Sequence, residues 1–165
     1  MEMKQNFFGK ADRIVGIALR GGSSFCISSL WIIVTAIVLL RFLPIFSMGW
    51  TDEIVELLFA WMIFSASAEL CRQRKHFTVD LIPNTVAGTR TGHIVDIVIQ
   101  SLALAFLLIF TYEGALLTIK ATDRSPIFEY PKTLWYKSMP ISGMIMIGYT
   151  IRDLLGFFRH RVPEK

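Results

Sequence analysis

The sequence predicts an all-α integral membrane protein with four transmembrane helices and with both chain ends in the cytoplasm. Of its 165 residues, 53% are hydrophobic and only 18% carry charge, a balance too apolar for a soluble domain. The apolar residues form four long blocks separated by short charged connectors, as expected where lipid is the solvent. Lys and Arg are divided unequally among the connectors, which predicts the orientation. We expect residues 1–165 to form a single membrane domain.

The N-terminal segment before the first apolar block is amphipathic. Apolar side chains recur at helical spacing over residues 1–20, while Lys10 and Arg13 lie outside that stripe. This pattern predicts an N-terminal interfacial amphipathic helix that lies on the membrane, with basic side chains near anionic headgroups. Gly21 and Gly22 offer a flexible corner before the chain enters the bilayer. The alternative interpretation is a frayed polar tail.

Two transmembrane helices are predicted in the first half of the chain. Residues 23–43 carry no charge before Arg41, and Pro44 ends that helix. The second helix, residues 51–71, is ambiguous by hydropathy alone because its uncharged stretch covers only 12 residues. Acidic side chains in its first turn and basic side chains after its last turn complement the helix dipole. Counted over its whole length, this helix is long enough to cross the membrane.

Two further transmembrane helices are predicted in the second half. Residues 93–119 form a run of 27 residues. Because about 20 residues suffice to span hydrocarbon, this helix should tilt or protrude. Residues 135–158 form the last span, with Pro140 tolerated in its first turns and Trp135 suited to the outer headgroup belt.

The distribution of Lys and Arg predicts the orientation of these spans. Of the 17 such residues, 12 belong to the N-terminal segment, the connector at 72–92 and the C-terminal end. The positive-inside rule places these three regions in the cytoplasm. The five basic residues expected on the outer side are Arg41, Lys120, Arg124, Lys132 and Lys137.

Charged side chains at the two ends of the second helix are candidates for helix packing, because an unpaired charge inside a bilayer is costly. Arg41 either pairs with the acidic side chains at the outer end of that helix or snorkels to the headgroups. Glu69 precedes Arg72 by one helical turn, a spacing that allows an ion pair on one helix face or a solvated interfacial pair. The acidic side chains at the outer end are Asp52, Glu53 and Glu56.

The second helix also carries small residues that let another helix approach closely. These are Ala60 and the stretch at residues 65–68. In lipid, apolar area alone gives no association, so small residues mark helix contacts. The contacts lie either within this chain or, as we favour, with a larger partner membrane protein.

The sequence lacks the patterns typical of catalytic and cofactor sites. No nucleophile elbow, glycine-rich phosphate loop or metal-spaced set of His, Cys and carboxylates occurs, so we expect no enzyme activity, no metal and no cofactor. None of His76, His93 and His160 is expected at mid-membrane, which argues against a haem-binding anchor. The net charge of +4 is modest and the basic residues flank the apolar blocks, so nucleic acid is not an expected partner.

The second helix and the connector after it carry a recognisable pattern. Trp50 and an acidic pair precede an apolar helix, and a basic segment from Arg72 leads to a His-x-x-(Val/Ile)-Asp motif that begins at His76 and ends at Asp80. This pattern resembles the small, DctQ-like membrane subunit of tripartite ATP-independent periplasmic (TRAP) transporters. Pro140 in the last helix also fits, whereas the first and third helices agree only in hydropathy.

The resemblance implies a multi-pass protein of the bacterial inner membrane that contacts lipids and has two protein partners, a large TRAP membrane subunit and a periplasmic substrate-binding protein. It implies a scaffold subunit of a sodium-coupled secondary transporter that takes up organic acids, including dicarboxylates and sialic acid. The alternative is a self-contained four-helix membrane carrier or haem-binding anchor. The residues expected at helix-packing or subunit interfaces are Arg41, Trp50, Asp52, Glu53, Glu56, Glu69, Arg72, His76, Asp80 and Pro140.

The outer connector is the expected docking surface for the periplasmic binding protein. Between residues 120 and 137 it carries four basic and two acidic side chains, an excess that membrane proteins usually avoid on this side. Prolines stiffen the connector, and aromatic side chains add surface of the type that anchors interfaces. The alternative is that the aromatics sit in the headgroup belt and the lysines meet lipid phosphates. The residues expected to dock are Lys120, Arg124, Lys132, Trp135 and Lys137.

Overall fold

The computed structural model describes residues 2–42, 49–73 and 90–159, and most of these residues are helical. Four helices are long and one is short. They are α1 (Glu2–Leu40), α2 (Gly49–Arg72), α3 (Arg90–Lys120), α4 (Thr133–Tyr136) and α5 (Ser138–Arg159).

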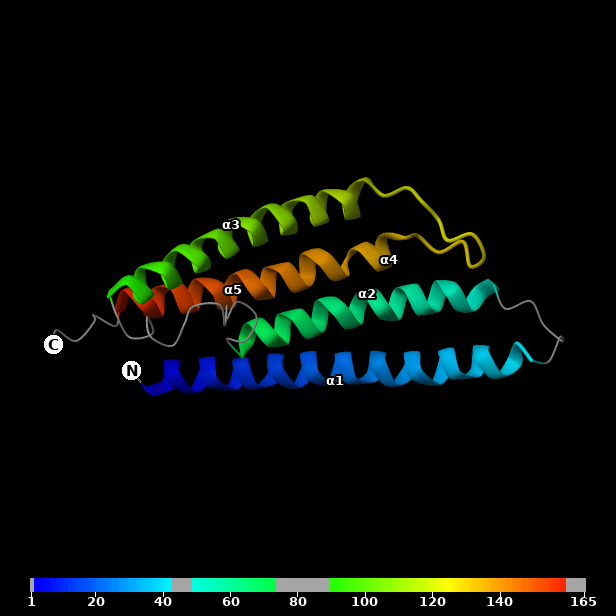
Figure 1. Cartoon of the computed structure of the whole chain (residues 1–165), viewed down its shortest axis with the longest axis horizontal. Coiled ribbons are helices and arrows are strands. Elements are labelled where there is room, and N and C mark those ends of the chain that lie inside the picture. Colours follow the sequence, from blue (N-terminus) through cyan, green and yellow to red (C-terminus); the bar gives the residue numbers. More distant parts are fainter. Residues whose placement is uncertain (1, 43–48, 74–89, 160–165) are drawn as a thin grey trace.

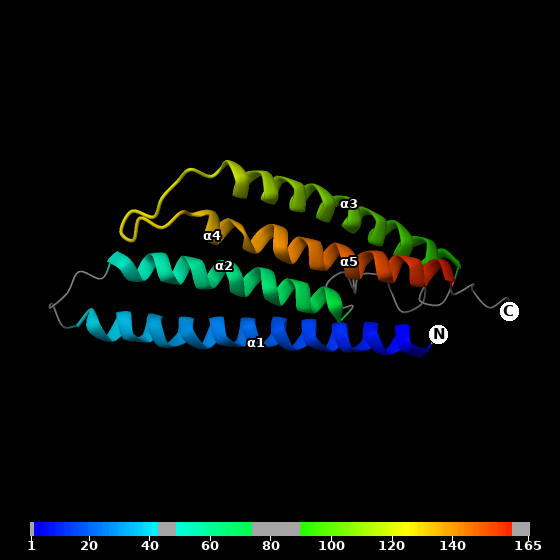
Figure 2. The ribbon, with the colours of Figure 1, turned by 180° about the vertical axis from the view of Figure 1, so that it is seen from behind.

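The long helices lie side by side in one row (Figures 1 and 2). In that row α1 packs on α2, α2 packs on α5, and α5 packs on α3, so α1 and α3 form the two edges. The start of α1 and the end of α5 lie at one end of the molecule, and the loop at residues 121–132 lies toward the other (Figure 1). Large apolar side chains such as Trp31 and Phe106 are exposed along both edges, as expected for a protein whose solvent is lipid or a membrane partner.

The first helix differs from the prediction. A single helix runs from Glu2 to Leu40, in place of an interfacial helix that turns at Gly21 and Gly22 into a separate span. Glycine inside a helix costs only about 1 kcal/mol, which contacts elsewhere readily exceed. The Ser23 hydroxyl donates a hydrogen bond to the carbonyl oxygen of Leu19 at 2.8 Å, across the expected corner. This part of α1 packs on the protein through Leu19, which is buried, and Val15, whereas Ile14 of the expected stripe is 67% exposed.

Three helices of the described part are long and apolar enough to cross a membrane. They cover Gly9–Leu40, Gly49–Arg72 and Ile94–Lys120. The helix predicted at residues 135–158 is divided into α4 and α5 by a turn at Lys137. Pro140 accounts for the break, because its ring would clash with the carbonyl four residues earlier and it has no N–H to donate there. It occupies the first turn of α5, where proline is tolerated.

The centre of the row is a small apolar core to which all four long helices contribute. Leu107 of α3 and Met146 of α5 are almost completely buried. They form one cluster with Ala68 and Cys71 of α2 and with Leu19 of α1. A cluster shared in this way ties the row together at one level along the helices.

Two glycines allow α3 and α5 to approach each other closely. Gly114 of α3 faces Met139 and Pro140, and Gly143 of α5 faces the side chain of Thr111. A methyl group at position 143 would lie only 3.1 Å from the Cβ atom of Thr111, whereas a methyl group at Gly148 would meet nothing within 4 Å. Small residues at a helix contact are the usual means of close packing in lipid.

Replacing Gly143 with Leu should therefore push α3 away from α5. Overpacking of a close contact costs about 1–3 kcal/mol or more, so we expect a clearly lower unfolding temperature of the purified protein in mild detergent. Gly148→Leu is the matched control on the same helix, since the side chain would project into open space. Equal unfolding temperatures for the two variants would show that this helix contact does not support the fold.

Candidate functional site

A buried carboxylate connects the first turn of α2 with the loop at residues 121–132, which belongs to the connector predicted on the outer side and is called the outer loop below. Glu53 is only 8% exposed, and its side chain accepts hydrogen bonds from the hydroxyl of Ser125 and from the backbone N–H of Ile127 at 2.9 Å and of Phe128 at 3.4 Å. Because Ser125 is also buried, one carboxylate oxygen and one hydroxyl form the centre of the contact. We call Glu53, Ser125, Ile127 and Phe128 the outer clamp.

The loop that Glu53 holds is itself closely folded. The backbone N–H of Ser125 donates to the carbonyl oxygen of Tyr130 at 2.9 Å, and the backbone N–H of Lys132 donates to the backbone carbonyl oxygen of Asp123 at 2.9 Å. Glu129 adopts a positive φ of 54°, which lets the chain reverse within a few residues. The loop therefore presents its tip in a defined conformation. The exposed tip side chains are Ile127, Phe128 and Tyr130, and the last two rings stack with centroids 6.1 Å apart.

At the other end of the row, Arg72 is the centre of a network of charged side chains. Its guanidinium donates two hydrogen bonds to Glu69, at 2.7 and 2.8 Å, and one to Asp12 of α1 at 3.0 Å. Glu69 is 5% exposed and also accepts from Gln73 at 2.7 Å, while Arg20 of α1 approaches it at 3.3 Å. The predicted pairing of Glu69 with Arg72 is therefore present, in the packed rather than the solvated form.

Helix α5 joins the same network. Tyr149 donates its hydroxyl to Asp12 at 2.9 Å, and the Arg152 guanidinium lies over the Tyr149 ring, 4.7 Å from its centroid. Arg152 also donates to the carbonyl oxygen of Arg72 at 3.3 Å and to Asp153 at 2.8 Å. Three helices are thus connected by charged hydrogen bonds in which the buried carboxylates have partners. We call Asp12, Glu69, Arg72, Tyr149 and Arg152 the inner network.

A second fixed contact joins α2 to the short helix α4. The indole N–H of Trp61 donates to the carbonyl oxygen of Leu134 at 3.2 Å. The neighbouring Trp135 is only 7% exposed, so its ring packs inside the protein. This corrects the expectation that Trp135 adds aromatic surface to the headgroup belt or to the docking loop. The exposed tip aromatics, Phe128 and Tyr130, supply that surface instead.

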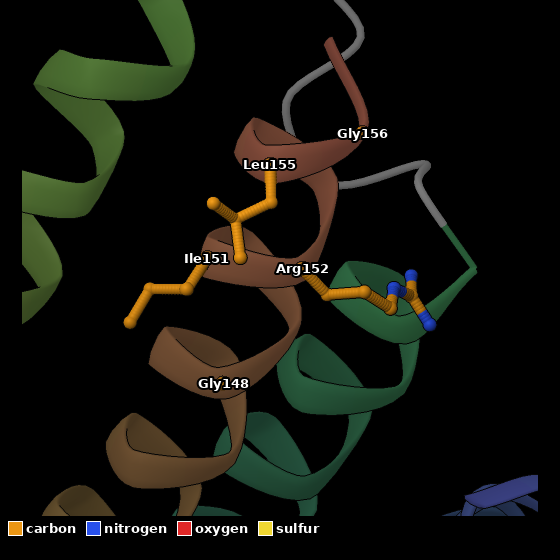
Figure 3. A pocket seen from close by; sticks show the side chains of 5 residues that line it. All are labelled: Gly148, Ile151, Arg152, Leu155 and Gly156. Carbon is orange, nitrogen blue, oxygen red and sulfur yellow. The ribbon is translucent and has the colours of Figure 1, made fainter. Parts of the chain in front are cut away.

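A shallow hollow on the surface of α5 is lined by Gly148, Ile151, Arg152, Leu155 and Gly156 (Figure 3). The two glycines have no side chains to fill the hollow, and the side chains of Ile151 and Leu155 form its apolar lining. Figure 3 shows Arg152 pointing away from Ile151 and toward the end of α2, where its guanidinium is already bonded. The hollow therefore has the character of an apolar helix surface and offers no free charge to a ligand.

A comparison with known protein families matches residues 30–160 of this chain to the family described as tripartite ATP-independent periplasmic transporters, DctQ component. The chain belongs to this family. No curated protein matches the sequence. The matched range contains the outer clamp and all of α2, α3 and α5, whereas Asp12 and Arg20 of α1 precede it. The DctQ family is a transporter component and not an enzyme family, and this chain is accordingly a membrane protein of a TRAP transport system.

The residues expected at the helix-packing or subunit interfaces of this DctQ component differ in burial. Glu53, Glu69 and Pro140 are buried, and Arg72 is largely covered by the inner network. The exposed members are Arg41, Trp50, Asp52 and Glu56. Within the described ranges, Arg41 forms no ion pair, so the pairing alternative is not observed there. His76 and Asp80 of the family motif lie outside the described residues.

The residues expected to dock the binding protein also differ in burial. Lys120, Arg124 and Lys137 are exposed and Lys132 is half-buried, and all four lie in or next to the loop at residues 121–132. Whether they contact another protein stays a prediction. In the part of the chain that the structure describes, no group of three or more His, Cys, Asp and Glu side chains is arranged to hold a metal ion.

Sequence reasoning missed several residues that the fold brings together. Asp12 lay in the segment expected to form an interfacial helix but had no role of its own. Arg152 counted toward orientation and toward the family resemblance of the last helix, and Tyr149 and Ser125 had no assigned role. Each of them has at least one bonded partner 60 or more positions away in the sequence, as Asp12 has in Arg72. The available signal was chemical: a polar or charged side chain inside an apolar helix needs a partner.

Proposed function

We propose that this DctQ-family chain is a scaffold subunit of a sodium-coupled secondary transporter for organic acids in the bacterial inner membrane. In this proposal it supports a large membrane subunit and helps to dock a periplasmic substrate-binding protein. The observation that carries the scaffold role is the use of its buried carboxylates. The carboxylate oxygens of Glu53 and Glu69 accept hydrogen bonds from donors of the same chain. These side chains therefore hold parts of the chain together and are not free to bind a substrate or a coupling ion.

Recovery of a tagged copy from bacterial membranes in mild detergent tests this function. A large membrane protein should co-purify in a fixed ratio, and adding the periplasmic binding protein should give a three-component complex in the presence of substrate. A chain that is recovered alone, and that transports a solute by itself in liposomes, would instead be a self-contained carrier.

The proposed topology has four spans, with α5 as the last, and with both chain ends inside. Its support is the excess of Lys and Arg on one side and the location of the start of α1 and the end of α5 at one end of the row (Figure 1). α5 is not among the three helices of the described part that are long and apolar enough by themselves to cross a membrane, and it carries Tyr149 and Arg152 of the inner network. These two side chains are bonded within the protein and so do not prevent insertion.

Single cysteines introduced near Arg74, Arg161 and Arg124 test the orientation. In intact cells, a membrane-impermeant thiol reagent should label the cysteine near Arg124 and spare the other two, and permeabilised cells should show labelling at all three. The native Cys26 and Cys71 are buried free thiols, so their replacement by Ser provides a clean background. Labelling near Arg74 with protection near Arg124 would invert the topology.

The outer loop is the proposed docking surface for the binding protein. It combines an exposed aromatic tip, Phe128 with Tyr130, and flanking basic side chains, so it offers both the apolar anchor and the charged rim of a protein interface. The outer clamp holds this tip in place, which lowers the ordering cost of binding. In the alternative interpretation, the same basic side chains contact lipid headgroups, and the aromatic tip does not bind a protein.

Two variants distinguish these alternatives. Phe128→Ala should raise the binding-protein concentration needed for half-maximal transport by roughly tenfold, since aromatic anchors carry much of an interface's energy. Reversing Lys137 to Glu should act mainly through association rate and salt dependence. Ile119→Ala, an exposed apolar residue at the end of α3, is the control. If both loop variants behave like the control, the loop does not dock the binding protein.

A further inference from the structure

Helix α3 forms one edge of the row and exposes a broad apolar surface. Among the α3 residues whose burial is described, the buried ones are Gly92, Ala103, Leu107 and Gly114, which lie on one narrow side. On the outward side, Phe106 and Ile109 are each more than 60% exposed. Within a membrane such a surface faces either lipid chains or another membrane protein.

Glu113 places a carboxyl group on that surface. Its side chain is exposed, and it has no hydrogen-bond or ion-pair partner in the described part of the chain. Apolar side chains are exposed on both sides of it along the helix, with Ile109 one turn before and Leu117 one turn after. Glu113 therefore lies within the apolar stretch Ile94–Lys120 and not at its charged end.

The packing of α3 prevents Glu113 from turning toward its own chain. The next residue, Gly114, faces Met139 and Pro140 of α5, with a methyl group at Gly114 lying 3.1 Å from the Met139 Cβ atom. Successive residues of a helix are about 100° apart, so the Glu113 side chain projects sideways from this contact. Phe106, Phe110 and Glu113 follow one another at helical spacing on one stripe, and Phe110 contacts Phe64 of α2. The stripe is therefore covered at Phe110, through its ring contact with Phe64, and is exposed at Phe106 and Glu113 on either side.

We infer that Glu113 forms an ion pair with a Lys or Arg side chain on a membrane helix of the large subunit, which covers this stripe of α3. Hydrocarbon is a poor environment for an unpaired carboxylate, and acidic side chains in membrane helices pair with a cation or face a protein interior. A second copy of this chain fits less well, because a two-fold contact across the same stripe would bring the two Glu113 side chains together. The identity of the partner rests on the proposed function, whereas the need for a cationic partner rests on the geometry of α3.

Charge variants of Glu113 test this pair in the assembled transporter. The tagged full chain is co-expressed with the large subunit, and the large subunit recovered per tagged chain is measured. Glu113→Lys should lower that recovery roughly tenfold and Glu113→Gln by less, since like charges at an interface repel more strongly than a neutral group. Asp96→Lys, an exposed carboxylate near the inner end of the same helix, is the matched control and should leave recovery unchanged. Wild-type recovery of the large subunit with Glu113→Lys would overturn the inference.

A photo-crosslinking amino acid at Ile109 keeps the test independent of folding, because Glu113 is then unchanged. The expected adduct joins this chain to the large subunit, and peptide mapping should locate a Lys or Arg on the crosslinked helix. An adduct with lipid only, or with a second copy of this chain, would contradict the proposed occupant. If the wild-type chain does not recover a large subunit at all, the proposed function fails first. If wild type recovers it and the Glu113 variants do so equally, only this inference fails.

Discussion

Replacing Arg72 with Ala should destabilise the protein more than any other single change at its polar sites. Glu69 is 5% exposed and would lose its two hydrogen bonds from the guanidinium, and Asp12 would lose its link to α2. Removing one partner of a buried ion pair typically costs about 3–5 kcal/mol. Because Gln73 and Arg20 still contact Glu69 in this variant, we expect the lower end of that range. We expect this loss in the free energy of unfolding, measured by denaturant titration of the purified protein in mild detergent.

Two further variants test whether the loss arises from the uncompensated charge. Glu69→Gln in the Arg72→Ala background should restore part of the stability, because the buried charge is then removed. Arg13→Ala is the control, since Arg13 is an exposed arginine of α1 that has no bonded partner in the described structure. An Arg72→Ala protein as stable as the Arg13→Ala protein would show that the inner network does not hold α1, α2 and α5 together.

Replacing Glu53 with Ala should release the outer loop without unfolding the row of helices. The Ser125 hydroxyl and the N–H groups of Ile127 and Phe128 would lose their acceptor, and a buried polar group left unpaired costs about 1–3 kcal/mol. Amide hydrogen exchange at Ile127 and Phe128 should become roughly tenfold faster or more, while exchange in the middle of α3 stays unchanged.

The adjacent Asp52 provides the control for the outer clamp. It is also acidic and lies in the first turn of α2, but its side chain is exposed. Asp52→Asn should therefore leave hydrogen exchange in the loop as it is. Equal acceleration by both variants would mean that the loop responds to the charge at the helix end and not to the specific hydrogen bonds of Glu53.

The sequence was most informative where the deciding interaction is local. Glu69 and Arg72 are three residues apart on one helix, so helical spacing was enough to predict that they could pair, although not whether the pair would be packed or solvated. The break before α5 was not predicted, because Pro140 was expected to be tolerated within one continuous helix at residues 135–158. The apolar blocks located α2 and α3 to within a few residues, because length and hydropathy suffice for a membrane helix.

The sequence was least informative where partners are distant along the chain. Glu53 and Ser125 are 72 positions apart, and no local pattern shows that the first turn of α2 meets the outer loop. The corner at Gly21 and Gly22 was a wrong prediction because glycine permits a bend without requiring one. The N-terminal part of α1 continues straight into the rest of the helix because Asp12 and Arg20 contact side chains of α2.

The number of sodium ions transported per substrate tests the scaffold role most directly. The large subunit, the binding protein and this chain are reconstituted in liposomes, and sodium and substrate uptake are measured together for wild type and for the double variant Asp52→Asn, Glu53→Gln. If the carboxylates of α2 only hold the structure, the double variant should transport more slowly with the same ratio of sodium to substrate. A changed ratio would place a coupling-ion site in this chain and contradict the scaffold role.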